Sequence, residues 1–388
     1  MTNIPYGRQT INDADMEAVQ SVLRSDWLTQ GPVIANFEQS VAEYCGAKYA
    51  VAVSNATAAL HLACLAFKLG PGDYLWTSPN TFVASANCAL YCGAQVDFVD
   101  VDARTFNISV AALAAKLEQA ERTGNLPKVL VPVHFAGQSC EMSEIKELAQ
   151  QYGFSLLEDA SHAIGGRYQG SKVGACEYSD ATVFSFHPVK IITSGEGGMV
   201  LTNDEQLYQA LLRLRSHGIT RDPRFLQGES DGPWCYQQLD LGYNYRMTDM
   251  QAALGLSQMQ RLDEFVAIRR QRVESYRLAL SGLPLKLAET LHGVEPAWHL
   301  QVVCLDDPLW RKPVFDALRE IGIQVNVHYQ PVYLQPYYRQ LGFLPGLCPE
   351  AERYYHGALT LPLYPGMSDQ DFSFIVSSFK NILSEIAL

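Results

Sequence analysis

Residues 154–202 read FSLLEDASHAIGGRYQGSKVGACEYSDATVFSFHPVKIITSGEGGMVLT. Asp159 ends one apolar run, and Lys190 follows a second run, residues 181–186, into a Gly-rich turn. A third apolar run, residues 199–202, comes directly afterwards. Ligands of open α/β sheets bind at the carboxyl ends of the strands. We therefore expect the acid and the lysine to face a single pocket.

That pairing suits pyridoxal 5'-phosphate (PLP). A lysine among apolar residues has a lowered pKa, which favours a neutral amine able to bond an aldehyde. A carboxylate opposite a ring nitrogen keeps that nitrogen protonated, so the ring becomes an electron sink. Two other interpretations of Asp159 stay open: it caps the next segment, or it binds a ribose. No G-x-G-x-x-G motif follows an upstream strand, which disfavours the ribose and a nicotinamide oxidoreductase.

The first two-thirds of the chain alternates strand-like and helix-like segments. Strands are expected at residues 49–54, 74–78, 95–99, 129–133, 155–157, 181–186 and 199–202. Helices are expected at residues 13–24, 36–45, 57–69, 81–92, 110–122 and 143–152. Apolar strands separated by helices predict an α/β fold, with a mostly parallel central sheet and helices on both faces.

The pattern changes near residue 248. We expect one long, broken helix at 248–280, strands at 300–305 and 324–328, and helices at 313–321 and 369–386. The chain is therefore expected to form a large α/β domain, residues 1–247, and a smaller C-terminal α+β domain, residues 248–388. Residues 1–30 of the large domain are expected to line the active site.

Composition excludes several classes of protein. The 388 residues carry a net charge of −12, which argues against nucleic acid as a partner. No apolar segment is long enough to cross a bilayer, and MTNIPYGRQT lacks the pattern of a signal peptide, so we expect a cytoplasmic protein. Nine scattered cysteines without a C-x-x-C pair predict free thiols and no metal site. Cys88 and Cys92 have helical spacing, which we interpret as packing.

Other local features fit the same cofactor. The turn Ser54-Asn55-Ala56-Thr57 opens a helix whose free N–H groups could bind a phosphate, although these residue types are also ordinary helix caps. Phe82 could stack on a flat ring or could simply be a core residue. Ser185 could donate to the phosphate. His187 is as consistent with packing in a loop as with catalysis.

These segments together resemble one family. SNATAALHLA, TFVASANCAL, EDASHAIGG, FSFHPVKIITSGEGG, RSHG, LGYNYRMTDMQAALGLSQM and VHYQPVYLQPYY occur in the order found in sugar-nucleotide aminotransferases of the DegT/StrS type. The match runs from Tyr6 to about Pro365. The resemblance implies fold type I of the PLP enzymes and a homodimer with shared active sites.

The resemblance also implies roles by position. Lys190 would bond the cofactor and later move a proton, and Asp159 would pair with its ring nitrogen. The expected cofactor-binding residues are Ala56, Thr57, Phe82, Asp159, His162, Ser185 and Lys190, with Asn244 from the partner subunit. The expected substrate-binding residues are Tyr6, Asp26, Trp27, Leu28, Thr29, His187, Arg246, His328, Tyr329, Gln330 and Pro331. Two departures from the family are Ala56, where many relatives have Gly, and Tyr333, where many have His.

Within the family, SFHPVKIITSGEGG, DWLTQG and HYQPVY are most similar to members that act in pseudaminic acid synthesis. The activity implied is transfer of an amino group from L-glutamate to C4 of a UDP-linked 4-keto-6-deoxy-N-acetylhexosamine. Alternatives are another UDP- or dTDP-4-keto sugar, a PLP-dependent sugar dehydratase, or a non-catalytic regulator with the same fold. Dehydratases of this kind often replace the lysine with His, so Lys190 favours amino transfer.

Overall fold

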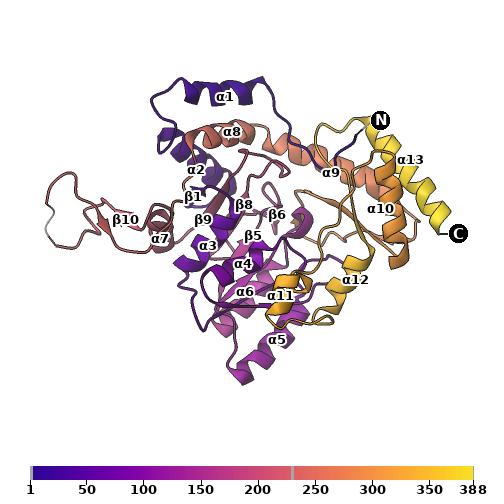
Figure 1. The fold of residues 1–388 in the computed structure, drawn as a ribbon, viewed down its shortest axis with the longest axis horizontal. Helices are drawn as coiled ribbons and strands as arrows, with labels where there is room; N and C mark the ends of the chain where they lie inside the picture. The colour runs from indigo at the N-terminus through magenta and orange to yellow at the C-terminus, as the bar shows by residue number, and fades with distance from the viewer. Residues whose placement is uncertain (1–2, 229–230, 388) are drawn as a thin grey trace.

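A seven-stranded sheet forms the centre of the molecule (Figure 1). The computed structural model describes residues 3–228 and 231–387; residues 1–2 of the expected N-terminal lining and residue 388 lie outside them. In spatial order the strands are β1 (Tyr49–Val53), β9 (Gly198–Thr202), β8 (Ala181–Ser185), β5 (Ser155–Asp159), β4 (Val129–Val131), β2 (Tyr74–Thr77) and β3 (Gln95–Phe98). Only β9 runs against its neighbours; the other neighbouring pairs are parallel, as the sequence predicts.

Helices cover both faces of this sheet. The helices are α1 (Asp13–Leu23), α2 (Pro32–Cys45), α3 (Ala56–Ala66), α4 (Ala84–Tyr91), α5 (Val110–Thr123), α6 (Met142–Tyr152), α7 (Glu205–Arg215), α8 (Asp249–Met259), α9 (Leu262–Ala279), α10 (Arg311–Glu320), α11 (Pro336–Gln340), α12 (Pro349–Gly357) and α13 (Asp369–Ile386). Short 3₁₀ helices are η1 (Phe135–Gly137), η2 (Pro308–Trp310) and η3 (Val332–Leu334). Successive strand residues point to opposite faces, so Val51 packs with α3 while Ala52 packs with α2 and α8.

One edge of the sheet collects the loops that carry the predicted site. β1, β2, β4, β5 and β8 all end there, and β9 begins there, because Ser185 and Val53 both pair with Gly198. The segments Ser54–Thr57, Asp159–His162 and Ser185–Lys190 are therefore neighbours in space although they are far apart in the chain. The fold itself brings the acid and the lysine to one edge.

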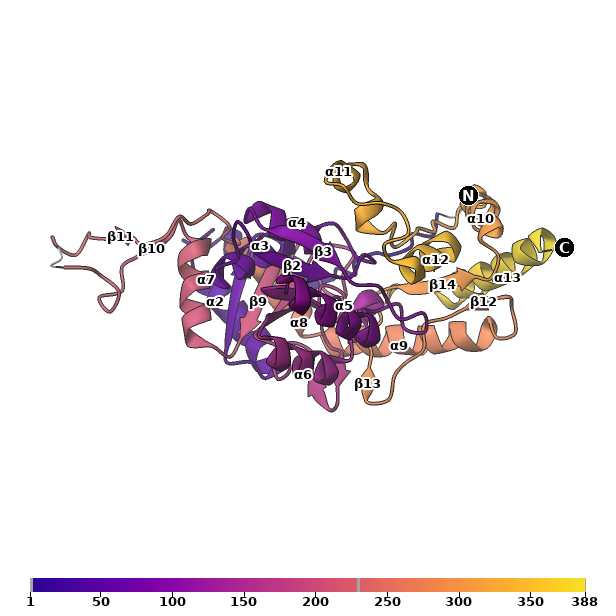
Figure 2. The same ribbon diagram turned by 90° about the horizontal axis from the view of Figure 1, so that it is seen from below.

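The C-terminal part has a core of its own. A second sheet, β12 (Leu285–Lys286), β14 (Gln301–Leu305) and β15 (Ala358–Leu361), packs with α10 and α13. The long helix predicted at 248–280 is broken, since α8 ends at Met259 and α9 begins at Leu262. Figure 2 shows α9 running from the large sheet to this second core. The separation is incomplete, because Tyr333, Tyr338 and Ala351 pack into the core of the large sheet.

Two predicted elements need correction. The helix expected from residue 36 begins at Pro32, because Asp249 accepts hydrogen bonds from the backbone N–H groups of Gly31 (2.8 Å) and Val33 (3.2 Å) and stabilises its start. The strand expected at 324–328 is wrong. β15 pairs with β14 instead, and only single bridges tie Ile323 to Ile4 and Asn326 to Thr360. The following residues leave the sheet and reach the pocket described below.

Two further small sheets complete the fold, and Tyr168 and Val294 of the first pack into the core of the large sheet. One consists of β13 (Val294–Glu295), β6 (Arg167–Tyr168) and β7 (Ser171–Lys172). The other, β10 (Ile219–Thr220) with β11 (Gln237–Gln238), is part of an arm that projects from the body beyond α7 (Figures 1 and 2). Trp234 and Leu241 on this arm are 74% and 81% exposed. Over the described ranges, no helix is both long and apolar enough to span a membrane.

Candidate active site

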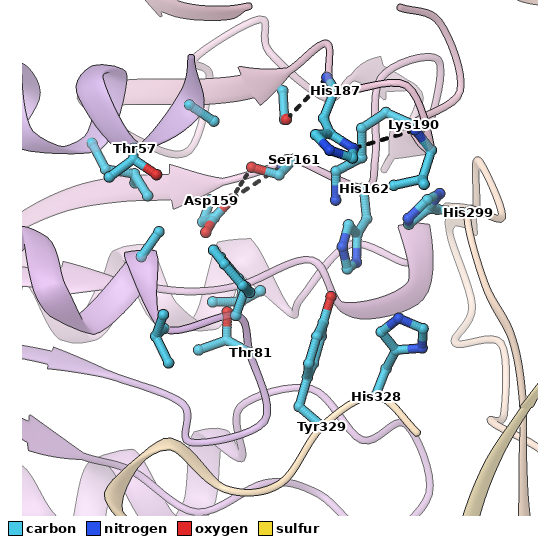
Figure 3. Close-up of a pocket in the computed structure, with 18 of the residues that line it drawn as sticks. Thr57, Thr81, Asp159, Ser161, His162, His187, Lys190, His299, His328 and Tyr329 are labelled. Atoms are coloured by element: carbon cyan, nitrogen blue, oxygen red, sulfur yellow. Dashed lines mark hydrogen bonds between the residues drawn. The ribbon is translucent and has the colours of Figure 1, made fainter. Parts of the chain in front are cut away.

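The loops at the sheet edge enclose a pocket of about 930 Å³. Twelve of the predicted site residues line it, from both the large sheet and the segment before η3 (Figure 3). They are Tyr6, Ala56, Thr57, Phe82, Asp159, His162, Ser185, His187, Lys190, His328, Tyr329 and Gln330. One pocket thus contains both Asp159 and Lys190.

Lys190 stands in the turn after β8, where its backbone N–H donates to the His187 carbonyl at 2.9 Å. Burial in the pocket lowers the pKa of Lys190 to about 8, although the negative charge of Asp159 opposes that shift. Its amine is therefore neutral in a much larger fraction of molecules near neutral pH than a surface lysine is. This is the state that attacks an aldehyde.

Asp159 is buried and held in place by hydroxyl groups from two elements. Ser85 Oγ, on α4, donates to its Oδ2 at 2.6 Å. Ser161 donates to its Oδ1 through the backbone N–H at 3.1 Å and through Oγ at 2.6 Å. The carboxylate is fixed at the end of β5 and lines the pocket. Ser161 lies two residues after the acid, a spacing that could have indicated it, whereas Ser85 has no such local signal.

Three neutral histidines line the same pocket. Burial is the largest cause that lowers the pKa of His328 to about 3 and the pKa values of His162 and His299 well below 6.5; nearby Lys190 acts in the same direction. The rings of His162 and His299 lie 4.4 Å apart between centroids, inclined at 46°. Nδ1 of each is buried and has no hydrogen-bond partner among the described residues. His299 was missed in the sequence, where it follows Trp298 without a recognisable motif.

The start of α3 forms the remaining wall. Asn55 caps the helix by accepting the Ala58 N–H at 2.9 Å, and Ala56 and Thr57 line the pocket. Ala56 is the first helical residue and has no positive φ, so the departure from Gly is accommodated. Gly198 of β9 lies in close contact with the backbone at the start of α3. A Cβ atom added to Gly198 would lie 2.5 Å from the Asn55 carbonyl carbon and 2.6 Å from the Ala56 nitrogen.

Some predicted residues lie elsewhere in the single chain. The residues that do not line this pocket are Asp26, Trp27, Leu28, Thr29, Asn244, Arg246 and Pro331. Thr29 pairs with Thr248 and Asn244 with Ser216, while Trp27 lines a separate cavity of about 440 Å³ between α1, α2 and α8. Tyr333 is also outside: it is fully buried, and its hydroxyl bonds to Glu352.

Comparison with known proteins agrees with this geometry. The model of the DegT/DnrJ/EryC1/StrS aminotransferase family matches residues 9–380. The chain belongs to this family.

Relatives of known name or structure match the chain over almost its whole length. The spore coat polysaccharide biosynthesis protein SpsC of Bacillus subtilis is 39% identical over 98% of this chain and 97% of its own. PseC of Helicobacter pylori, an aminotransferase involved in the biosynthesis of pseudoaminic acid, has 30% identity and a TM-score of 0.90 over 99% and 100% of the two chains. Spr1654 of Streptococcus pneumoniae, solved in a PLP form, has 29% identity and a TM-score of 0.89 over 99% and 100%.

Membership in the DegT/DnrJ/EryC1/StrS family makes the chain a PLP-dependent sugar aminotransferase with the type I fold. The residues present fit the cofactor. A lysine of lowered pKa and a fixed carboxylate line one pocket, and the His162 Nδ1 atom in its wall has no partner among the described residues. Phe82 lines the pocket and is 59% exposed, which leaves its ring open to a flat ligand. The α3 N-terminus provides free N–H groups that suit a phosphate.

Proposed function

We propose that the enzyme transfers the amino group of L-glutamate to C4 of a UDP-linked 4-keto-6-deoxy-N-acetylhexosamine. In full, UDP-2-acetamido-2,6-dideoxy-β-L-arabino-hex-4-ulose would become UDP-4-amino-4,6-dideoxy-N-acetyl-β-L-altrosamine, a reaction of the pseudaminic acid pathway. The observation that carries amino transfer is Lys190 opposite Asp159 in one pocket. The likeness to PseC across the chain and the sequence motif SFHPVKIITSGEGG around Lys190 support the choice of sugar.

In this proposal each pocket wall holds one part of PLP. Ala56, Thr57 and Ser185 hold the phosphate, Phe82 covers the ring, and Asp159 faces the ring nitrogen. His162 faces the ring hydroxyl, for which its Nδ1 atom has a free position. When bound, PLP supplies an electron sink for the carbon atom that loses a proton.

Lys190 moves the proton in this scheme. Its Nζ accepts a proton from the donor carbon as general base and returns one to the acceptor side as general acid. A pKa of about 8 suits both directions, because neither protonation state is strongly preferred near neutral pH.

The sugar would lie against the wall contributed by the C-terminal part. Tyr6 and His328 have their ring centroids 5.4 Å apart, and Tyr329 and Gln330 continue the same wall. The neutral His328 can offer a hydrogen bond without attracting a charge; its Nδ1 is already 2.9 Å from the Thr360 hydroxyl. Such a wall suits the hydroxyl and acetamido groups of a hexosamine.

A second copy of the chain would complete the site. The cofactor phosphate, a diphosphate and a glutamate carboxylate are all anions, but Lys190 is the only lysine or arginine among the described residues that line the pocket. We propose a homodimer in which the partner supplies Asn244 to the phosphate. In this dimer the substrate side of the site is completed by Arg246, by residues 26–29 and by the arm. His187 and Pro331 would complete the substrate site within one chain, and we propose residues 1–247 and 248–388 as the two domains.

The test is to offer the purified holoenzyme L-glutamate with a panel of UDP- and dTDP-4-keto sugars and to identify the products by mass spectrometry. We expect amination of the UDP-linked 4-keto-6-deoxy-N-acetylhexosamine. Amination of a dTDP-sugar alone would overturn the proposed substrate. A failure to release 2-oxoglutarate with any sugar of the panel would count against the whole proposal.

A further inference from the structure

A cluster of thiols lies behind the active site, between α3 and α4. Cys88 lies on α4 and Cys92 caps its end, and the structure adds Cys64 from α3, which packs against α4. Both the Cys88 and the Cys92 thiols neighbour the Cys64 thiol closely enough to raise its pKa well above the usual value. The sequence alone indicates packing for Cys88 and Cys92, whereas the fold brings a further cysteine, Cys64, and a histidine, His61, close to them.

His61 completes the cluster one turn before Cys64 on α3. Its ring contacts Tyr91, with centroids 5.5 Å apart, and its buried Nε2 atom has no hydrogen-bond partner in the described part of the chain. Among residues 3–228 and 231–387, no group of three or more His, Cys, Asp or Glu side chains has an arrangement that could hold a metal ion. These side chains thus lie on two helices that pack against each other.

The two thiols best placed for that chemistry are Cys64 and Cys92. The Cys88 S–H donates to the Ser85 carbonyl of its own helix at 3.3 Å, so its hydrogen is engaged. Cys64 is fully buried, whereas Cys92 is only partly buried and can be reached from solvent. The pair thus consists of one accessible thiol and one protected neighbour.

The environment of Cys92 also favours its reactive form. The Cys64 thiol is the largest cause that lowers the pKa of Cys92 to about 6, and the nearby His61 ring adds to it. The lowered pKa increases the share of the thiolate, which is the form that attacks oxidants. Cys304 is also partly buried, but burial raises its pKa to about 11, so it provides an internal control.

We propose that Cys92 and Cys64 are an oxidisable pair that closes a disulfide between α4 and α3. The Cys92 thiolate attacks a peroxide oxygen, the O–O bond breaks, and sulfenic acid and water form after protonation. The Cys64 thiol then attacks the Cys92 sulfur, the S–O bond breaks, and a second water leaves. Overall, two thiols and one peroxide give one disulfide and two waters, as in known pairs of a low-pKa cysteine and a resolving cysteine.

The position of this pair links it to the pocket without making it part of the pocket. Ala56 and Thr57, at the start of α3, and Ala84, at the start of α4, line the active site. Cys64 and Cys92 lie toward the opposite ends of the same two helices. A disulfide there joins the two helices that carry these pocket residues.

The test uses the holoenzyme treated with hydrogen peroxide, alkylated, and digested without reduction. We expect a crosslinked peptide pair containing Cys64 and Cys92, with a mass loss of two hydrogen atoms, and we expect Cys304 to be alkylated rather than oxidised. The variant Cys88→Ser should form the same crosslink. In Cys64→Ser, Cys92 should pass instead to the sulfinic and sulfonic acids.

A wild-type protein in which Cys92 remains alkylatable, overoxidises without a crosslink, or pairs with Cys88 would overturn the proposal. Because the wild-type map decides the outcome, a variant that fails to fold leaves the test intact.

Discussion

Lys190 and Asp159 influence each other through the pocket that they share. Burial favours the neutral amine of Lys190, whereas the Asp159 carboxylate favours its charged form, and burial has the larger effect. The hydroxyls of Ser85 and Ser161 keep the carboxylate oriented. The result is an amine that can both bond an aldehyde and carry a proton.

Replacing the lysine should therefore abolish the activity. We expect Lys190→Ala to lose the visible absorbance of covalently bound cofactor and to reduce turnover by about 10²–10⁴-fold or more, the contribution of one positioned acid–base group. Release of 2-oxoglutarate from glutamate measures turnover. The matched control is Lys312→Ala, which removes an exposed lysine paired with Asp316 and should leave both readouts unchanged. Full turnover by Lys190→Ala would show that another group carries the proton.

The lowered pKa predicts how the apoprotein takes up PLP as pH changes. Only the neutral amine attacks the aldehyde, so the rate of reconstitution should rise with pH through an apparent pKa of about 8 rather than one near 10.5. Asp159→Asn removes a negative charge that raises the pKa, so its midpoint should move to lower pH. Stopped-flow absorbance after mixing with PLP measures the rate. A midpoint above 10, or an upward shift in Asp159→Asn, would contradict the electrostatic argument.

Elements set the pocket by bringing loop ends together. β9 pairs with both β1 and β8, and Gly198 at its start contacts the first turn of α3. This close approach fixes the helix N-terminus that we propose for the phosphate. A side chain at Gly198 would separate the strand from the helix.

Gly198→Ala tests this contact. The added Cβ would meet backbone atoms that cannot rotate away, and overpacking of this kind costs about 1–3 kcal/mol. We expect an apparent PLP affinity at least about fivefold weaker, measured by equilibrium titration of the apoprotein, together with a lower Tm. Gly70→Ala is the control, because nothing lies within 4 Å of its Cβ position and its φ is not positive. Equal affinities in the two variants would show that the α3 N-terminus does not hold the phosphate.

The elements also show what the sequence could and could not predict. Apolar runs identified every strand of the central sheet, and with it the positions of Asp159 and Lys190, because local burial patterns carry that information. The start of α2 at Pro32 and the path of residues 324–328 depend on distant partners, Asp249 and β15. The contact of Ser85 with Asp159 and the place of His299 in the pocket also depend on distant parts of the chain. His299 is held by its N–H to the Ala136 carbonyl, at 2.8 Å, a contact that no local pattern encodes.

At the scale of the whole molecule, the charges in the pocket do not match the proposed ligands. The described lining has one lysine and no arginine, and its buried histidines are neutral. The arm that projects beyond α7 carries Arg221, Arg224, which pairs with Asp222 on the same arm, and exposed Trp234 (Figure 1). An exposed aromatic arm with basic residues suits contact with a second copy better than a free existence in water.

Shared sites predict complementation between two inactive variants. Lys190→Ala lacks the lysine of its own site, and Asn244→Ala would lack the group that it lends to its partner. A heterodimer of the two, coexpressed and purified through two different tags, then contains one complete site and one doubly defective site, so we expect about half of the wild-type turnover. Each variant purified alone should be strongly impaired, and a doubly tagged Lys190→Ala dimer is the control for contamination by wild-type enzyme. Asn244 pairs with Ser216 outside the pocket of its own chain, which is why we propose that it acts in the partner's site. If Asn244 instead acts within its own chain, both sites of the heterodimer are defective and no activity returns.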